Sequence, residues 1–348
     1  MNGIKDLKSC SQEEMQELVL QLGQPKFRAA QLFDWMCKGA ESFDEMKNVP
    51  AAFKTQLQNA GYFISYASVY RKWVSRIDKT VKYLFELHDK ERVEAVVMQY
   101  KHGYSMCIST QAGCRMGCRF CASTIDGKQR DLTAGEMLSQ IFAAQKDLNI
   151  RISNVVLMGM GEPLDNFDNT VRFLKLAGNE KGLHIGMRHI SVSTCGLVEG
   201  IRRLKDLNLQ ITLSVSLHAA DNATRDQIMP VNKKWPIEVL LQACREYIEV
   251  TGRRISFEYA VIKGVNDTPQ DADKLADLLK GMLCHVNLIP VNPVKEEFVK
   301  PDRIYIEKFA DRLKNKGINT TIRRTLGADI QASCGQLRAK DRTETAVL

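Results

Sequence analysis

Gly-Cys-Arg-Met-Gly-Cys-Arg-Phe-Cys-Ala-Ser-Thr, residues 113–124, places three cysteines in one short loop with the spacing C-x3-C-x2-C. A structural zinc site usually takes four protein ligands in two separated pairs, and this run supplies three. Three thiolates can instead hold a [4Fe–4S] cluster and leave one iron open for a substrate's amino and carboxylate groups. Such clusters work with S-adenosylmethionine in radical chemistry. The spacing therefore favours a cluster on Cys114, Cys118 and Cys121, and a zinc knuckle with a distant fourth ligand is the alternative.

Outward from this loop, strands and helices alternate along the chain. Short apolar, β-branched runs predict strands at 106–110, 154–159, 189–194, 211–217, 255–261, 285–289 and 319–324. Amphipathic stretches between them predict helices, among them 133–148, 198–207, 237–250, 270–280 and 303–315. Repeated β-α units give a parallel sheet with helices outside, so we expect an α/β fold, an incomplete (β/α)6-type barrel.

Polar residues and cysteines recur where the predicted strands end. The cysteine loop follows the first strand, the turn from Gly159 to Glu162 follows the second, and Cys334 follows the last. The carboxyl ends of barrel strands share one face, where barrel enzymes place their chemistry. We therefore expect Cys114 and Cys334 to be neighbours, together with the residues at the other strand ends: Gly161, Glu162, Ser193, Ser216, Leu217, His218 and Asn292.

The first hundred residues have a different pattern. Ser11 and Glu14 form a capping-box signature for one helix, and Pro25 and Pro50 open two more. Period-two alternation over 80–87 and 93–98 predicts strands. The predicted organisation is a helical RNA-binding accessory domain (1–62), a β-rich connecting segment (63–105), the partial barrel (106–338) and a C-terminal tail (339–348).

Charge and composition limit the partners. The 348 residues carry a net charge of +8, which permits a polyanionic partner. Tyr70 and Trp73 are interleaved with basic residues from Arg71 to Arg76, a pattern that suits RNA contact. We find neither a membrane-spanning apolar run nor the apolar stretch of a signal peptide, so we expect a cytoplasmic protein with no membrane partner. Its ten cysteines should then be thiols or metal ligands.

Further motifs accompany the cysteine loop: Gly-Met-Gly-Glu-Pro-Leu (159–164), Ser-Leu-His (216–218), Asn-Leu-Ile-Pro-Val-Asn-Pro (287–293) and Ala-Ser-Cys-Gly-Gln-Leu (332–337). With these motifs in this order, the chain resembles the radical S-adenosylmethionine RNA adenine methyltransferases from about residue 5 to about residue 338. It most resembles the branch that methylates adenine C2. That branch usually has proline where this chain has Pro163, whereas the C8 branch tends to have alanine.

The resemblance implies roles that the residues alone do not establish. Cys334 matches the methyl carrier, an S-methylcysteine intermediate, and Cys107 matches the thiol that resolves the adduct through a transient disulfide with Cys334. Glu94 matches the proton acceptor. Without the resemblance, Glu94 is a solvated charge on a strand and each cysteine is a small buried hydrophobe. The cofactor contacts that it implies are Gly161, Glu162, Ser193, Ser216, Leu217, His218 and Asn292.

The family implies methylation of an adenine in 23S rRNA and of the adenine beside the anticodon in tRNA, with two S-adenosylmethionine molecules per turnover. It also implies an external, flavodoxin-type reductant, and we expect a monomer. The alternatives are adenine-C8 methylation, which confers antibiotic resistance, a radical enzyme that activates a protein, and a non-enzymatic metal-bearing RNA-binding module. The protein-activating enzyme would not need Cys334.

Overall fold

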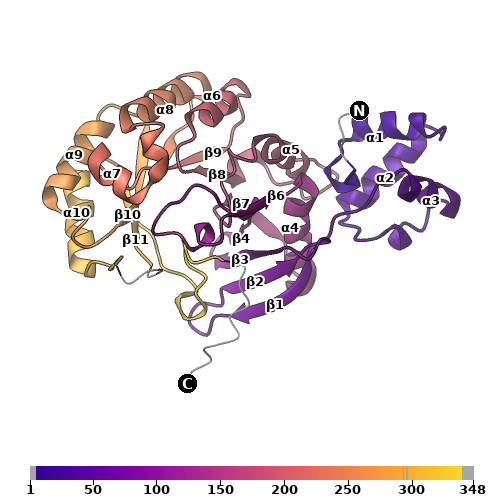
Figure 1. Ribbon diagram of the computed structural model, residues 1–348, viewed down its shortest axis with the longest axis horizontal. Helices are drawn as coiled ribbons and strands as arrows, with labels where there is room; N and C mark the ends of the chain where they lie inside the picture. Colours follow the sequence, from indigo (N-terminus) through magenta and orange to yellow (C-terminus); the bar gives the residue numbers. More distant parts are fainter. Residues whose placement is uncertain (1–4, 293, 295–296, 339–348) are drawn as a thin grey trace.

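One mixed sheet runs through the molecule, and helices cover its outer side (Figure 1). The computed structural model describes residues 5–292, 294 and 297–338. Within them the sheet has the strand order β1-β2-β3-β4-β7-β8-β9-β10-β11-β12. From β4 onward each neighbouring pair is parallel, and the sheet stays open. These parallel strands are β4 (Gly103–Cys107), β7 (Ile152–Leu157), β8 (Ile190–Thr194), β9 (Thr212–Ser216), β10 (Ile255–Val261), β11 (Cys284–Pro290) and β12 (Thr320–Ile322).

Helices connect successive parallel strands, and each buries an apolar face in the core that it shares with the sheet. They are α4 (Ala134–Leu148), α5 (Phe167–Ala177), α6 (Val198–Asp206), α7 (Asn222–Ile228), α8 (Ile237–Thr251), α9 (Pro269–Leu279) and α10 (Arg303–Asn315). This arrangement confirms the predicted incomplete (β/α)6-type barrel. Helices α5 and α7 were not among those named from the sequence, and α7 spans only seven residues, too few for a clear helical period.

Three antiparallel strands extend the sheet beyond β4: β1 (Ser68–Val74), β2 (Val81–Glu86) and β3 (Arg92–Tyr100). The first barrel strand was predicted at 106–110, but β4 ends at Cys107. The prediction erred because the chain stays extended after Cys107. The Ile108 N–H still bonds to the Val156 carbonyl, and β5 (Gln111–Gly113) then pairs with β6 (Lys128–Asp131) in a separate ribbon.

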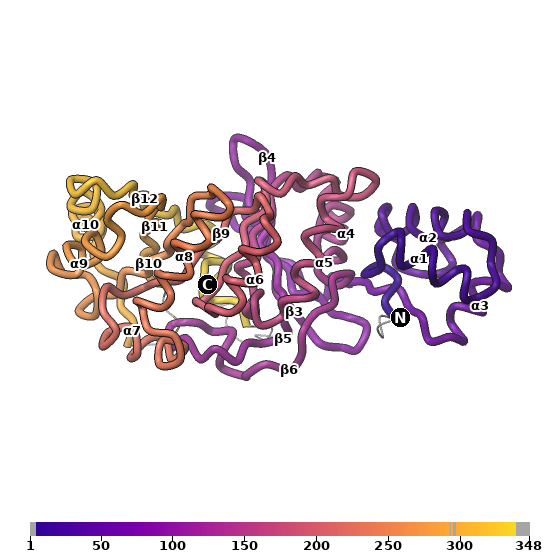
Figure 2. Tube along the Cα trace, turned by 90° about the horizontal axis from the view of Figure 1, so that it is seen from above, coloured from indigo at the N-terminus to yellow at the C-terminus, as the bar shows by residue number. Residues whose placement is uncertain are grey.

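The N-terminal helices α1 (Gln12–Gln21), α2 (Phe27–Cys37) and α3 (Ala51–Asn59) form a lobe beside the barrel, with an apolar cluster of their own (Figure 2). The predicted capping box at Ser11 is present. Buried polar contacts attach the lobe to the barrel. The Asp6 carboxylate accepts from the Ser65 N–H and the Thr133 hydroxyl, and the Lys8 amine donates to the Ser65 carbonyl at 2.6 Å.

Within the described part of the chain, no helix is both long and apolar enough to cross a membrane. The predicted tail, 339–348, lies outside the described residues, and RNA binding by the N-terminal lobe stays a prediction.

Candidate cofactor and thiol site

The cysteine loop is held between the β5–β6 ribbon and a short 3-10 turn, Ala122–Thr124. The Cys114 N–H donates to the Gly127 carbonyl at 3.1 Å, and the Thr124 hydroxyl donates to the Cys121 carbonyl at 3.0 Å. Gly113 precedes the loop with φ +76°, and a Cβ there would lie 1.9 Å from the Gly127 oxygen. Glycine is therefore required where the loop begins.

A cavity of about 160 Å³ lies at the carboxyl ends of the parallel strands. The residues predicted to bind the cluster or S-adenosylmethionine line it, except for Leu217, and so does Cys334. Leu217 is fully buried, and its backbone carbonyl accepts from the Arg225 side chain. The structure thus brings together Cys114, Cys118, Cys121, Gly161, Glu162, Ser193, Ser216, His218, Asn292 and Cys334.

The turn after β7 presents a buried carboxylate to this cavity. The Glu162 oxygens accept backbone N–H bonds from Leu164 at 3.0 Å and Cys195 at 2.8 Å. Burial raises the Glu162 pKa, although these backbone bonds oppose the rise. Gly161 has φ +102°, and a Cβ there would come within 2.6 Å of the Gln111 Cβ, so the turn cannot accept a side chain at this position.

His218 ends the β9 segment in a left-handed conformation, with φ +57°. Its Nδ1 accepts the Ala260 N–H at 2.8 Å, and its ring contacts Phe120 edge-on. Burial, with a smaller effect of the Arg225 charge, lowers the pKa of His218 to about 3. The imidazole is therefore neutral at physiological pH, and it serves as a hydrogen-bond acceptor for the backbone.

A second, smaller cavity of about 40 Å³ adjoins the first, and both thiols with predicted catalytic roles line it. Cys107 lines only this second cavity, whereas Cys334 and Arg323 line both. Burial, followed by the nearby Cys334, raises the Cys107 pKa to about 12, while Arg323 opposes the rise. Asn292 holds the segment that carries Cys334, because its side-chain amide donates to the Cys334 carbonyl at 2.9 Å.

Glu94 is the predicted proton acceptor. It is buried on β3 and lines neither cavity in the described structure. Its carboxylate pairs with the Lys82 amine at 3.4 Å and accepts the Arg338 N–H at 2.9 Å. Glu94 thus anchors the chain four residues after Cys334.

The three cysteine thiols fit a cluster better than a single ion. Tetrahedral zinc with bonds near 2.3 Å would draw its sulfur ligands to about 3.8 Å from one another. Among the described residues, His88, Asp89 and Glu136 form a group of three potential metal ligands whose ligand atoms all lie within 4.8 Å of one another. The sulfur atoms of the three loop cysteines do not all lie within this distance. Three thiols spread around one cavity, beside a buried carboxylate able to receive an ammonium group, suit a [4Fe–4S] cluster with bound S-adenosylmethionine.

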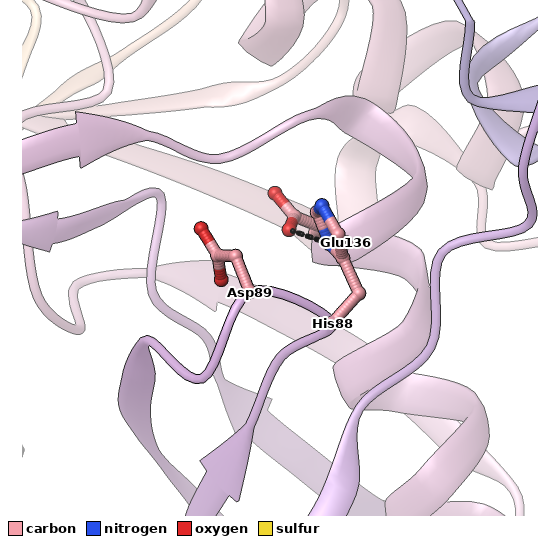
Figure 3. Close-up of side chains that lie close together, drawn as sticks. All are labelled: His88, Asp89 and Glu136. Atoms are coloured by element: carbon pink, nitrogen blue, oxygen red, sulfur yellow. Dashed lines mark ion pairs between the residues drawn. The ribbon is translucent and has the colours of Figure 1, made fainter. Parts of the chain in front are cut away.

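The side chains of His88, Asp89 and Glu136 point toward one another beside the start of α4 (Figure 3). Arg130 already supplies a cation to this group. Its guanidinium donates to both Glu136 oxygens at 2.8 Å and also pairs with Asp89. We therefore read this group as an ion-pair network that joins the β2–β3 turn to α4.

Three charged residues at the site had no cofactor or catalytic role in the sequence analysis. Glu258 lines the first cavity, and its carboxylate lies 3.9 Å from the Arg323 guanidinium. The available signal for Glu258 was a lone charge within the apolar strand Ile255–Val261. Arg323 stands next to Arg324 in the sequence, and adjacent arginines are ordinarily solvated. Arg225 gave no signal, because a helical arginine is ordinarily solvated.

Comparisons with known proteins agree with this geometry. Residues 108–279 match the family model of the radical SAM superfamily, and residues 5–62 match that of the ribosomal RNA large subunit methyltransferase N-terminal domain. The probable dual-specificity RNA methyltransferase RlmN of Alkaliphilus oremlandii (strain OhILAs) is 54% identical over 336 residues, 96% of this chain and 98% of that protein. The protein of the same description from Clostridium novyi (strain NT) is 50% identical, over 96% and 98% of the two chains.

Among solved structures, a radical SAM methyltransferase from Sphaerobacter thermophilus superposes with a TM-score of 0.91 at 39% identity, over 97% of this chain and 100% of that one. The superfamily match confirms the predicted cofactors, a [4Fe–4S] cluster and S-adenosylmethionine. The roles of individual site residues stay predictions.

Proposed function

Because this chain belongs to the RlmN family of radical S-adenosylmethionine methyltransferases, we propose that it methylates C2 of an adenine in 23S rRNA and of the adenine beside the anticodon in tRNAs. One observation carries the proposal. Cys334 lines both the cofactor cavity and the adjoining cavity that Cys107 lines. A thiol in this position can receive a methyl group on one side and deliver it on the other.

Methyl delivery through a thiol answers a chemical difficulty. Adenine C2 is not nucleophilic, so it cannot displace a methyl group from a sulfonium directly. In the first step the Cys334 thiol gives up its proton and its sulfur takes the methyl group of one S-adenosylmethionine by displacement, which would release S-adenosylhomocysteine. When bound, the cluster and a second S-adenosylmethionine supply the radical chemistry that removes a hydrogen atom from this methyl group. The Cys334 sulfur then holds the former methyl carbon while that carbon bonds to adenine C2.

Cys107 and Glu94 complete the proposed sequence. The odd-electron adduct first gives up one electron, for which the oxidised cluster would be the acceptor, and the C2 proton leaves. The Cys107 thiolate then bonds to the Cys334 sulfur while the bond from Cys334 to the transferred carbon breaks, and the released CH2 carbon takes up a proton to become the methyl group. The resulting disulfide is opened by an external two-electron reductant. Glu94 accepts the C2 proton. Its carboxylate holds the Arg338 N–H, so acceptance requires that this contact be exchanged when RNA enters.

The remaining partners follow from the same proposal. The N-terminal lobe, whose residues 5–62 match a ribosomal RNA methyltransferase domain, would contact RNA. A flavodoxin-type protein would supply electrons, and the enzyme would act as a cytoplasmic monomer.

The test of the proposal is the identity of the product. RNA lacking the modification should be incubated with reconstituted enzyme, digested to nucleosides and analysed by mass spectrometry. We expect 2-methyladenosine, in keeping with Pro163. A dominant 8-methyladenosine product would refute the C2 assignment, and an absence of methylated adenosine would refute the proposed function as a whole.

A further inference from the structure

Arg225 is a fully buried arginine beside the cofactor cavity, and the proposed reaction does not use it. It lies on α7 and belongs to the largest fully buried side chains of the described structure. Its Nη2 donates to the Cys195 carbonyl at 2.8 Å and to the Ser216 carbonyl at 3.1 Å, and its Nε donates to the Leu217 carbonyl at 3.0 Å. One guanidinium therefore fixes the chain just after β8 and at the end of β9.

These contacts lead directly to the cavity. Ser216 lines the cavity, and His218 follows the Leu217 carbonyl that Arg225 holds. Cys195 links Arg225 to the buried carboxylate, because its carbonyl accepts from Arg225 while its N–H donates to Glu162. The positions of several cofactor-facing groups thus depend on one side chain.

The charge of Arg225 also requires an explanation. In the described structure no carboxylate oxygen lies within ion-pair distance of it, and Asn232 stands between it and Asp226. A buried charge is costly unless an opposite charge compensates it. Helix α7 meets the cluster loop directly, because the N–H of Arg119, next to Cys118, donates to the Ile228 carbonyl at 3.0 Å. Burial lowers the Arg225 pKa, and the nearby cysteines and, to a smaller extent, Asp226 oppose that fall. A cluster held by three thiolates is anionic, and it would supply the missing countercharge.

We propose that Arg225 is a positioning residue of the cofactor site: its guanidinium fixes the ends of β8 and β9, and its positive charge compensates the thiolate-bound [4Fe–4S] cluster. The inference rests on the cofactors and not on the RNA substrate, so it can fail while the proposed function stands.

Two substitutions separate the charge from the geometry. R225Q removes the charge, so reduction of the cluster, which adds an electron, becomes less favourable. At a fixed potential the ratio of reduced to oxidised cluster should fall about tenfold, equivalent to about 59 mV for a one-electron couple. R225K keeps the charge but loses the planar set of guanidinium N–H donors that bond to the backbone carbonyls. Its reduction ratio should stay within about threefold of wild type, while its dissociation constant for S-adenosylmethionine should rise about tenfold.

R202Q is the matched control, because Arg202 is an exposed arginine on α6 and its loss changes the net charge equally. It should alter neither quantity. The measurements are an EPR-monitored redox titration and anaerobic equilibrium dialysis with S-adenosylmethionine, made on full-length reconstituted proteins with matched iron content and circular dichroism.

A folded R225Q protein with the wild-type reduction ratio would overturn the charge role. If R225Q does not fold, R225K decides the matter, since a folded R225K protein with wild-type affinity for S-adenosylmethionine would overturn the positioning role.

Discussion

His218 should make the stability of this protein depend on pH in a predictable way. The pKa of the buried imidazole is about 3 in the folded protein, whereas the ordinary pKa of a histidine side chain is 6.5. Below pH 6.5 the unfolded chain therefore binds a proton that the folded chain excludes. The stability contribution is present in full above pH 6.5 and is lost progressively as the pH falls toward 3. Between pH 6.5 and 5.0, at about 1.36 kcal/mol for each unit, the loss is about 2 kcal/mol.

His218→Asn should remove this dependence without straining the backbone. Asparagine tolerates the left-handed conformation, and its side-chain oxygen can accept the Ala260 N–H in place of Nδ1. Urea unfolding at pH 7.5 and pH 5.0 under reducing conditions would measure both proteins. The free energy of unfolding should fall by about 2 kcal/mol more in wild type than in the variant.

The matched control is His184→Asn, at an exposed histidine that also has a left-handed backbone, with φ +50°. This variant should keep the pH dependence of wild type. The reasoning is refuted if His218→Asn and wild type lose equal stability between the two pH values, because the imidazole would then be protonated equally in the folded and unfolded chains.

Three further predictions concern the cofactor site and the lobe. Alanine in place of Cys114, Cys118 or Cys121 should abolish the iron–sulfur chromophore and the cleavage of S-adenosylmethionine. A single mutant with full iron content and wild-type 5′-deoxyadenosine production would contradict this set of cluster ligands. Gly161→Ala should weaken S-adenosylmethionine binding at least tenfold in equilibrium dialysis, since the new Cβ would lie 2.6 Å from the Gln111 Cβ. An unchanged affinity would contradict this prediction, because it would show that the turn can accommodate the new methyl group. Asp6→Asn should lower the free energy of unfolding by about 1–3 kcal/mol, because one carboxylate oxygen accepts from the Ser65 N–H and the other from the Thr133 hydroxyl, and the amide keeps only one oxygen. An unchanged urea midpoint would contradict this.

The barrel could be predicted because its signals are local. Alternating β and α segments fix the order of the parallel strands, and the strand-end rule placed Cys334 beside the cluster loop across 220 residues. The error at β4 has a local cause too, since an extended chain after Cys107 carries the same residue types whether it pairs in the main sheet or in the β5–β6 ribbon.

Other features depend on tertiary contacts that no spacing encodes. Sequence reasoning could not separate Arg225, buried among backbone carbonyls, from a solvated helical arginine. Glu94 could be placed on its strand, but its engagement with Lys82 and the Arg338 N–H depends on how the chain returns after Cys334. The two adjoining cavities likewise exist only once β4, β11 and the last segment have come together.

The most direct test of the account concerns the two thiols that share the second cavity. Cys107→Ala should still accept a methyl group and attack the adenine, and then stall with RNA joined to Cys334 through one carbon. A denaturing gel with labelled RNA should show a shifted band for this variant and none for Cys334→Ala. Nuclease digestion and mass spectrometry should place the modification on Cys334. A Cys107→Ala enzyme that turns over normally and leaves no covalent RNA would contradict the account.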